Sequence, residues 1–395
     1  MIRLYTGFQF FFTLLLWLPI FYEYQRRLGL SDGEIFRIQS IYYLAFCFLE
    51  IPTGYIADRW GHRWCMRGGA GILVVSNLLP VLAPFYLGFL WHFLLLALSR
   101  SLISGASSAY LYDYLRGQGM AGEYKQIEGS ARAYGLVGKV VCWAGVGVLM
   151  AWHFSLPYWI TAGAALVSLG IAIALPSLST VSSAVGAKVR IREVWPVFLK
   201  SPMMIIVIAQ GVGAFVLARI CQVNLFQPIL EQRSFGLPVF GVMMSVTTLF
   251  EAAGAARPQW IRRWMGDLSA VFVLSAVMAV SLLMIAVSGK AGTAIGLCAF
   301  CFATGLSFPI QRQLLNDAIP DSRYRATLLS LESLVDRAVC SGVVVILGSY
   351  VSQGRLNEFL QRSAVLTLLI LGALWLFTVV AGRRKSKFVT PSVRM

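Results

Sequence analysis

The chain has 395 residues, of which 58% are hydrophobic and only 13% are charged. A soluble domain has about 45–50% apolar and about 25% charged residues, so this composition excludes a soluble enzyme, a disordered chain and a disulfide scaffold. The formal net charge is +16, from 33 Lys and Arg against 17 Asp and Glu. In a membrane protein such an excess reflects basic cytoplasmic loops, so we expect a lipid bilayer and no nucleic acid as a partner.

Apolar runs along the chain predict transmembrane helices. A span needs about 20 apolar residues, so twelve spans would use roughly 240 and leave short connections. The first run follows Met1–Thr6 directly and ends in Tyr22–Arg27 without a small-residue cleavage site, which indicates a span and not a signal peptide. Runs bounded by charge, Gly or Pro clusters predict spans near 5–25, 36–57, 67–87, 90–115, 130–151, 156–176, 203–226, 237–256, 268–288, 291–315, 325–350 and 362–382.

The distribution of Lys and Arg between the two sides of these spans predicts the orientation. About three times as many bases fall on the side of the N-terminus as on the other side. The positive-inside rule therefore places both termini in the cytoplasm. We expect a multi-pass protein of a bacterial inner (cytoplasmic) membrane.

The cysteines and histidines do not suggest a metal site. Cys298 and Cys301 form a CxxC, but it lies in an apolar span without a second Cys or His pair, which favours helix packing. The chain also lacks a GxxxxGK[ST] loop, so ATP is not expected to be the direct driver. No metal and no cofactor are predicted.

An internal repeat divides the chain. Shifting the first half by about 200 residues places Glu50 with its flanking residues on Glu251, each in the second span of its half. A similar shift places Asp113 on Asp317, both at the end of a fourth span. Parallel six-span halves around a midplane cavity are a transporter architecture. The predicted domains are an N-terminal six-helix bundle (1–180), a cytoplasmic linker (181–202) and a C-terminal six-helix bundle with a short basic tail (203–395).

The loop between the second and third spans reads GYIADRWGHRWCMR, residues 54–67. It resembles the G-x-x-x-D-R-x-G-R-R/K signature of the major facilitator superfamily, with His62 in place of one basic residue. Further segments resemble the drug-efflux-like branch of that superfamily: EIPTGYIADRWGHR, RSLISG from Arg100, NLFQPILEQ (224–232) and LLNDAIPDSRYRATLLSLESL (314–334). The resemblance implies an all-α membrane protein with twelve helices in two pseudo-symmetric six-helix bundles.

The resemblance also implies a cytoplasmic gate that latches and then breaks when the halves rock. Arg59 and Arg63 can pair with the acid at the end of the fourth span, while Asp58 can accept from the N-terminal amides of a neighbouring helix. The glycines allow close helix approach and a tight turn. The alternative is that these residues only set topology. The equivalent second-half loop has Gln259 in place of the Asp, so its latch is expected to be weak. The residues assigned to the gate are Gly54, Asp58, Arg59, Gly61, Arg63 and Asp113.

Ionisable residues inside the spans are candidates for transport chemistry, because an unpaired charge at that depth costs several kcal/mol. Four acids qualify, Glu50, Glu251, Glu332 and Asp336, and four bases, Arg100, Lys139, Arg219 and Arg337. All except Glu332 are assigned to proton coupling or to the substrate cavity. For each of these residues, the alternative is an ion pair that only stabilises the structure. Asp336 and Arg337 are adjacent, so they point about 100° apart, and we expect one to line the cavity while the other pairs with a neighbouring helix.

Two span residues are read partly through the resemblance. Arg100 begins RSLISG, which is similar to a span-four motif whose Arg is tied to proton coupling in relatives. Lys139 stands where drug antiporters often carry Pro, which weakens the case for antiport. Aromatic residues along the spans could stack on a planar substrate, although most are expected to pack.

We expect a monomeric secondary active transporter that exports a small organic molecule by alternating access coupled to protons. Because four bases lie in the spans, the substrate is expected to carry an anionic or strongly hydrogen-bonding group. Uptake of a metabolite or siderophore by the same fold is an alternative. A membrane-embedded lipid-modifying enzyme and a channel or sensor are more distant alternatives.

Overall fold

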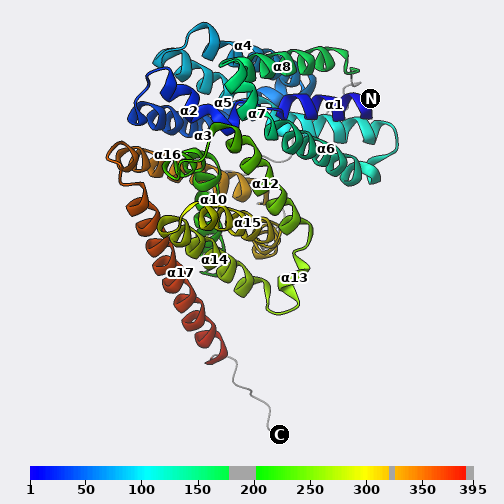
Figure 1. Ribbon diagram of the computed structural model, residues 1–395. Helices are drawn as coiled ribbons and strands as arrows, with labels where there is room; N and C mark the ends of the chain where they lie inside the picture. Colours follow the sequence, from blue (N-terminus) through cyan, green and yellow to red (C-terminus); the bar gives the residue numbers. More distant parts are fainter. Residues whose placement is uncertain (178–201, 320–324, 388–395) are drawn as a thin grey trace. The chain divides into compact units, whose positions relative to one another are not determined.

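The computed structural model describes residues 1–177, 202–319 and 325–387, without the side chains of Asp58, 202–203, 325–329 and 379–387. Every regular element in these residues is a helix (Figure 1). Eleven described helices are long and apolar enough to cross a membrane, and the number rises to twelve if one bent pair counts as a single span. The all-α, twelve-span prediction is therefore confirmed, while the side on which the termini lie remains a prediction.

The helices follow one another in a simple order. The earlier ones are α1 (Ile2–Thr13), the 3-10 turn η1 (Leu18–Ile20), α2 (Phe21–Arg27), α3 (Asp32–Trp60), α4 (His62–Leu82), α5 (Tyr86–Gly117), the 3-10 turn η2 (Ala121–Glu123), α6 (Tyr124–Ala144), α7 (Val146–Trp152) and α8 (Leu156–Ala174). The later ones are α10 (Pro202–Arg219), the π-helix η3 (Ile220–Leu225), α11 (Phe226–Gln232), α12 (Leu237–Ala256), α13 (Gln259–Arg262), α14 (Asp267–Val287), α15 (Lys290–Ala318), α16 (Arg325–Ser352) and α17 (Leu356–Lys387).

The chain divides into two compact units. The first contains the described residues of 1–186 with 223–246 and 337–354, and the second contains those of 187–222, 247–336 and 355–395. The first unit thus takes residues from both predicted halves, whereas the described residues of the second unit come from the predicted second half and the last position of the linker. The predicted linker 181–202 lies outside the described residues except for its last position. The division into halves remains a prediction from the repeat.

The first span is a broken helix whose free backbone groups find side-chain partners. Helix α1 ends at Thr13, and Pro19, which lacks an N–H, lies in the turn that leads into α2. The Leu16 N–H donates to Thr161 Oγ1 over 3.1 Å, and Trp143 Nε1 donates to the Leu15 carbonyl over 2.8 Å. These bonds satisfy polar groups that lipid cannot satisfy, so the break is tolerated inside the protein.

The fifth span is also bent, by 43° between α6 and α7. Glycines allow close approach to α12 of the same unit at this bend. A Cβ on Gly147 would overlap the Leu237 carbonyl, and one on Gly241 would overlap the Trp143 carbonyl. Backbone contact at both glycines explains why small residues stand on each side.

Helix α3 begins and ends with recognisable signals. Ser31 and Glu34 form a capping box, in which the Glu34 N–H donates to Ser31 Oγ and the Ser31 N–H donates to the Glu34 carboxylate. The helix ends at Trp60 and is followed by Gly61, whose φ of +89° suits glycine.

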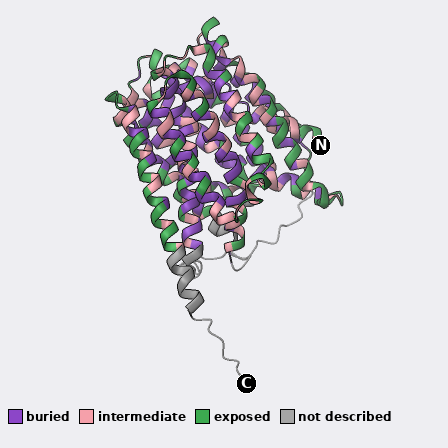
Figure 2. Ribbon diagram, turned by 60° about the horizontal axis from the view of Figure 1, so that its bottom comes forward, coloured by how far each residue is buried: buried purple, intermediate pink, exposed green. Residues whose placement is uncertain are grey.

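Burial is uneven among the spans (Figure 2). In the first unit Trp17 is 1% exposed, stacks on Tyr158 and donates to Asn77 over 2.7 Å. In the second unit α14 packs on α15 and on α17, whose outer face is largely exposed. An exposed apolar face on a long helix is what contact with lipid requires.

Candidate functional site

Helix α16 carries two acids, Glu332 and Asp336, one helical turn apart in the second unit. Each is paired with an arginine from another helix of that unit. Arg312 of α15 lies 2.8 Å from Glu332, and Arg219 of α10 lies 2.8 Å from Asp336. The acid side chains are only 1% and 6% exposed. Residues four apart share a helix face, so two like charges lie together and each is neutralised by its own base.

Glu332 uses only one of its carboxylate oxygens. Oε2 accepts from Arg312, whereas the buried Oε1 has no hydrogen-bond donor among the described residues. A buried polar atom without a partner is unusual, since such groups are nearly always hydrogen-bonded. This oxygen can therefore accept a proton or a hydrogen bond from a bound molecule.

Two aromatic rings lie beside Arg312. Its guanidinium carbon is 5.2 Å from the ring centre of Phe215 and 5.5 Å from that of Phe308. The two rings are 5.4 Å apart, and the Phe308 side chain is exposed. Cation–π contact holds the guanidinium in place without an additional negative charge. The arrangement offers a positive charge and flat apolar surfaces at one point.

Arg219 is the last residue of α10, where the helix changes to the π-helix η3. Single π-turns occur often at functional sites. Gln222 of this turn donates to Glu251 of α12 over 3.2 Å and lies 3.7 Å from Cys301. The π-turn therefore begins beside one ion pair and presents an amide to another span acid.

In the first unit, Glu50 of α3 pairs with Arg337 of α16. The carboxylate oxygen lies 2.6 Å from the guanidinium, which also lies over the Phe46 ring, 3.8 Å from its centre. We expected only one of Asp336 and Arg337 to pair with a neighbouring helix. Both do so, because the 100° step between them directs each side chain toward a residue of opposite charge on a different helix.

The other two predicted span bases differ from each other. Arg100 of α5 is exposed and has no hydrogen bond or ion pair to any described residue. The next residue, Ser101, shares a hydrogen bond of 2.6 Å with Thr53 of α3. Lys139 is half-buried on α6. The structure thus groups Glu50 with Arg337 and Arg219 with Asp336, and leaves Arg100 apart.

The expected pairing in the gate is different in the structure. The acid at the end of α5, Asp113, faces His62, with 3.6 Å between Oδ2 and Nε2. Arg63 instead donates to the Ile173 carbonyl at the end of α8, and Arg59 reaches only the Tyr55 hydroxyl at 3.5 Å. The expected arginine pairs to Asp113 are therefore absent from the described contacts. The reason is that the last carbonyls of a helix attract a base as an acid does.

The gate glycines also separate into two kinds. Gly61 has the positive φ that a tight turn requires. Gly54 has no atom within 4 Å of where its Cβ would lie, so the expected close approach is not found there. In the second half Gly254 does make such an approach, against the Phe302 carbonyl. The Asp58 side chain lies outside the described residues.

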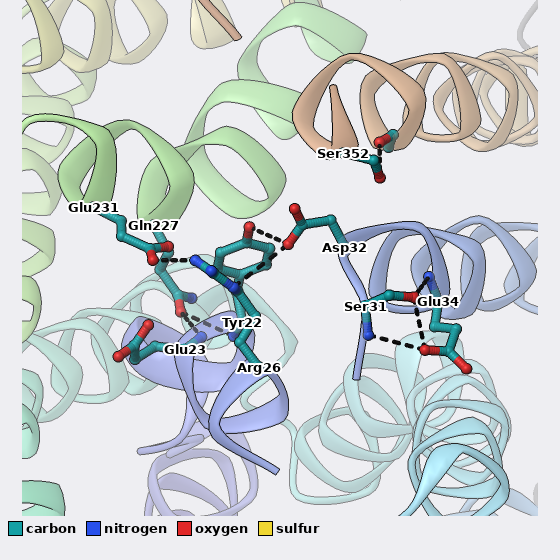
Figure 3. Close-up of polar contacts among 10 residues, drawn as sticks. Tyr22, Glu23, Arg26, Ser31, Asp32, Glu34, Gln227, Glu231 and Ser352 are labelled. Carbon is teal, nitrogen blue, oxygen red and sulfur yellow. Dashed lines mark hydrogen bonds and ion pairs between the residues drawn. The ribbon is translucent and has the colours of Figure 1, made fainter. Parts of the chain in front are cut away.

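A group of polar residues joins α2, α3 and α11 at one end of the first unit (Figure 3). Arg26 forms an ion pair with Glu231 and lies 3.6 Å from Asp32. Gln227 accepts from the Tyr22 N–H at 2.9 Å and donates to the Leu18 carbonyl at 3.0 Å. We call Arg26, Asp32, Gln227 and Glu231 the outer contact, because the predicted topology places it on the outer side.

The sequence reasoning missed two sites. Arg312 lies within the predicted span 291–315 but is not among the predicted span bases, although the four-residue spacing of Glu332 and Asp336 is a signal for a charged helix face. Glu128 falls between the predicted spans 90–115 and 130–151, yet it is 8% exposed and accepts from Tyr5 over 2.5 Å. Ser108 and Arg132 also bond to it, at 3.1 and 3.0 Å. A Tyr on α1 cannot be matched to a Glu 123 positions away without the fold.

Potential metal ligands do not gather in the part of the chain that the structure describes. No group of three or more His, Cys, Asp or Glu side chains there could hold an ion. The seven cysteines are all free of disulfides, and Cys298 and Cys301 both lie on α15.

The sequence profile of the family described as Major Facilitator Superfamily matches residues 4–335. The chain belongs to the major facilitator superfamily. The prediction from the 54–67 loop is thereby confirmed at the level of the superfamily, which supports a secondary transporter. The drug-efflux-like branch remains a prediction.

Solved structures show the same fold for this major facilitator chain. It is similar to a mutant of the nucleoside transporter NupG, with 14% identity and a TM-score of 0.79 over 94% of this chain and 98% of that one. It is also similar to the peptide transporter POT, with 14% identity and a TM-score of 0.75 over 97% and 93%. No curated protein matches it. Identities this low show the fold alone.

Proposed function

We propose that this chain is a proton-coupled secondary active transporter of a small organic molecule with an anionic group. It works as a monomer by alternating access in a bacterial inner membrane. Support comes from the superfamily and from the pairing of span acids with span bases. The observation that carries the proposal is Glu332, a buried acid with one oxygen on Arg312 and one without a donor among the described residues.

Glu332 provides the proton site in this proposal. An ionised carboxylate at this depth is stable only beside Arg312. When Glu332 is protonated, its attraction for the guanidinium is lost, and Arg312 becomes available to an anion. Asp336 and Arg219 repeat the same pairing one turn along α16. Proton binding and anion binding are thereby linked through the shared base.

The link between proton binding and anion binding affects the expected direction of transport. The motif resemblance favours export. If a proton on the acid frees the base for an anionic substrate, however, proton and substrate bind together and move the same way. Inward movement of both follows the proton gradient, so uptake is a second candidate function and has this specific support. The sign of proton movement decides between the two.

The test uses purified protein in liposomes that contain a pH-sensitive dye. Candidate metabolites and drugs are first selected by thermal stabilisation of the protein. Adding the substrate outside should change the internal pH, with acidification for uptake with a proton and alkalinisation for exchange against one. A membrane enzyme would instead return a chemically altered substrate.

Glu332→Gln keeps the shape of the side chain and removes the titration. It should still be stabilised by substrate, but proton movement should fall by about tenfold or more, which corresponds to about 1.4 kcal/mol in the coupled step. Asp267→Asn is the matched control, because Asp267 pairs with Arg262 outside this cluster at 2.8 Å. Unchanged proton movement in Glu332→Gln would refute the role of Glu332.

A further inference from the structure

Two exposed segments of the chain share a pattern of tryptophan and arginine. Each lies between two predicted spans, the first at the junction of α3 and α4 and the second around α13 (Figure 1). The pattern recurs 200 residues along the chain: Trp60, Arg63 and Trp64 correspond to Trp260, Arg263 and Trp264. The predicted topology places both segments on the cytoplasmic side. The first segment includes the predicted gate residue Arg63, whereas the second has no part in the transport chemistry proposed above.

The indoles of the second segment face outward. Trp264 is 82% exposed and Trp260 is 46% exposed, with the Trp260 ring 6.2 Å from Phe302 of α15. Tryptophan is enriched at membrane interfaces, where the ring lies at headgroup level. One ring is thus held against the protein while the other is free to enter the interface.

The bases of the second segment differ in how they are neutralised. Arg262 has two hydrogen bonds of 2.8 Å to Asp267 and a third to Gln313. Arg257 and Arg263 are exposed, and their side chains have no hydrogen bond or ion pair to any described residue. Two guanidinium groups without an acidic partner among the described residues therefore flank Trp260 in the sequence.

The first segment is a weaker version of the same pattern. Arg63 and Arg67 donate to the last carbonyls of α8, and Arg67 lies over the Trp64 ring at 5.3 Å. These guanidinium groups are partly occupied by the protein itself. The second segment therefore has the greater capacity to bind an external anion.

We propose that residues 257–264 bind the headgroup phosphate of an anionic phospholipid. Arg257 and Arg263 hold the phosphate oxygens, since guanidinium groups match phosphate geometry. Trp260 and Trp264 lie against the glycerol and upper acyl chains. A free phosphate could satisfy the bases alone, but two outward indoles beside them fit a ligand that has apolar chains.

The test measures lipid binding to the purified full-length chain by native mass spectrometry. Phosphatidylglycerol is compared with phosphatidylcholine of the same acyl chains, so that only the headgroup differs. With about 1 kcal/mol for each base near the lipid surface, the anionic lipid should bind roughly tenfold to thirtyfold more tightly. The double variant Arg257→Gln/Arg263→Gln should lose most of this preference.

Two further variants distinguish a site from general attraction to a basic protein. Arg3→Gln/Arg116→Gln removes the same charge from exposed positions on the predicted cytoplasmic side and should keep the preference. Trp264→Leu should weaken both lipids, whereas Trp152→Leu, at a ring 81% exposed elsewhere, should weaken neither. Equal loss in the two arginine variants, or displacement of the lipid by millimolar inorganic phosphate, would overturn the proposal. Retention of thermal stability in each variant shows that the change is not unfolding.

Discussion

The carboxylate of Glu50 lies 2.6 Å from the guanidinium of Arg337, although 287 positions separate the two residues in the chain. This pair connects the second predicted span to the eleventh, and thus the first half of the repeat to the second. Its side chains are only 27% and 14% exposed. An ion pair this far from water is expected to affect the stability of the protein and the exchange between its conformational states.

Removing one partner of that pair should destabilise the protein. Arg337→Gln leaves Glu50 without its base and should lower apparent stability by about 2 kcal/mol, less than for a fully buried pair because of the partial exposure. The swap Glu50→Arg/Arg337→Glu should recover part of the loss. Thermal unfolding in detergent measures both. Arg355→Gln is the control, since its pair with Glu358 is exposed and should contribute little.

The turn at Gly61 should not tolerate a side chain. Its φ of +89° is unfavourable for any residue with a Cβ, so Gly61→Ala should cost about 1–3 kcal/mol. Gly54→Ala provides the comparison on the same helix, because its Cβ would enter open space. That variant should be neutral or slightly stabilising, by up to about 1 kcal/mol. Apparent melting temperatures that do not differ between the two would contradict this account.

Tyr5 and Glu128 should show coupled effects on stability. Tyr5→Phe removes the donor that lies 2.5 Å from a buried carboxylate, with an expected cost of about 1–3 kcal/mol. The double variant with Glu128→Gln should cost less than the sum of the single ones, by about 0.5–3 kcal/mol. Arg132→Gln should have a small effect because its side chain is 73% exposed. Additive effects in the double variant would mean that the two groups do not interact.

The outer contact should control access from the predicted outer side. Ser40 is 6% exposed and shares a hydrogen bond of 2.7 Å with Ser341. In a background without native cysteines, Ser40→Cys should react slowly with an impermeant maleimide. Glu231→Ala should raise that rate severalfold, since Arg26 then keeps only Asp32 of α3 and loses its ion pair with α11, and the swap Arg26→Glu/Glu231→Arg should lower it again.

A nearby pair serves as the control for that experiment. Arg27 bonds to Glu23 at 2.7 Å within α2 and has no hydrogen bond or ion pair to another described helix. Arg27→Ala should therefore leave the labelling rate of Ser40→Cys unchanged. Equal acceleration by Arg27→Ala and Glu231→Ala would show that charge, and not the contact between helices, controls access.

The sequence by itself determined that this is an all-helical protein of about twelve spans in the major facilitator superfamily. Long apolar runs can only be helices in lipid, because backbone groups must be satisfied within the segment. The motif at 54–67 indicated the superfamily. The ionisable residues of the spans were recognisable because they interrupt the apolar pattern. These signals are local in the sequence, so they can be recognised without knowledge of the fold.

Only the tertiary structure decided which charges meet. The adjacent residues Asp336 and Arg337 form ion pairs with different helices. Asp113 faces His62, and Arg63 donates a hydrogen bond to a carbonyl at the end of α8. The sequence expectation failed there because a helix end competes with a carboxylate for the same base. Partner choice depends on distances between helices far apart in the chain, and only packing sets those distances.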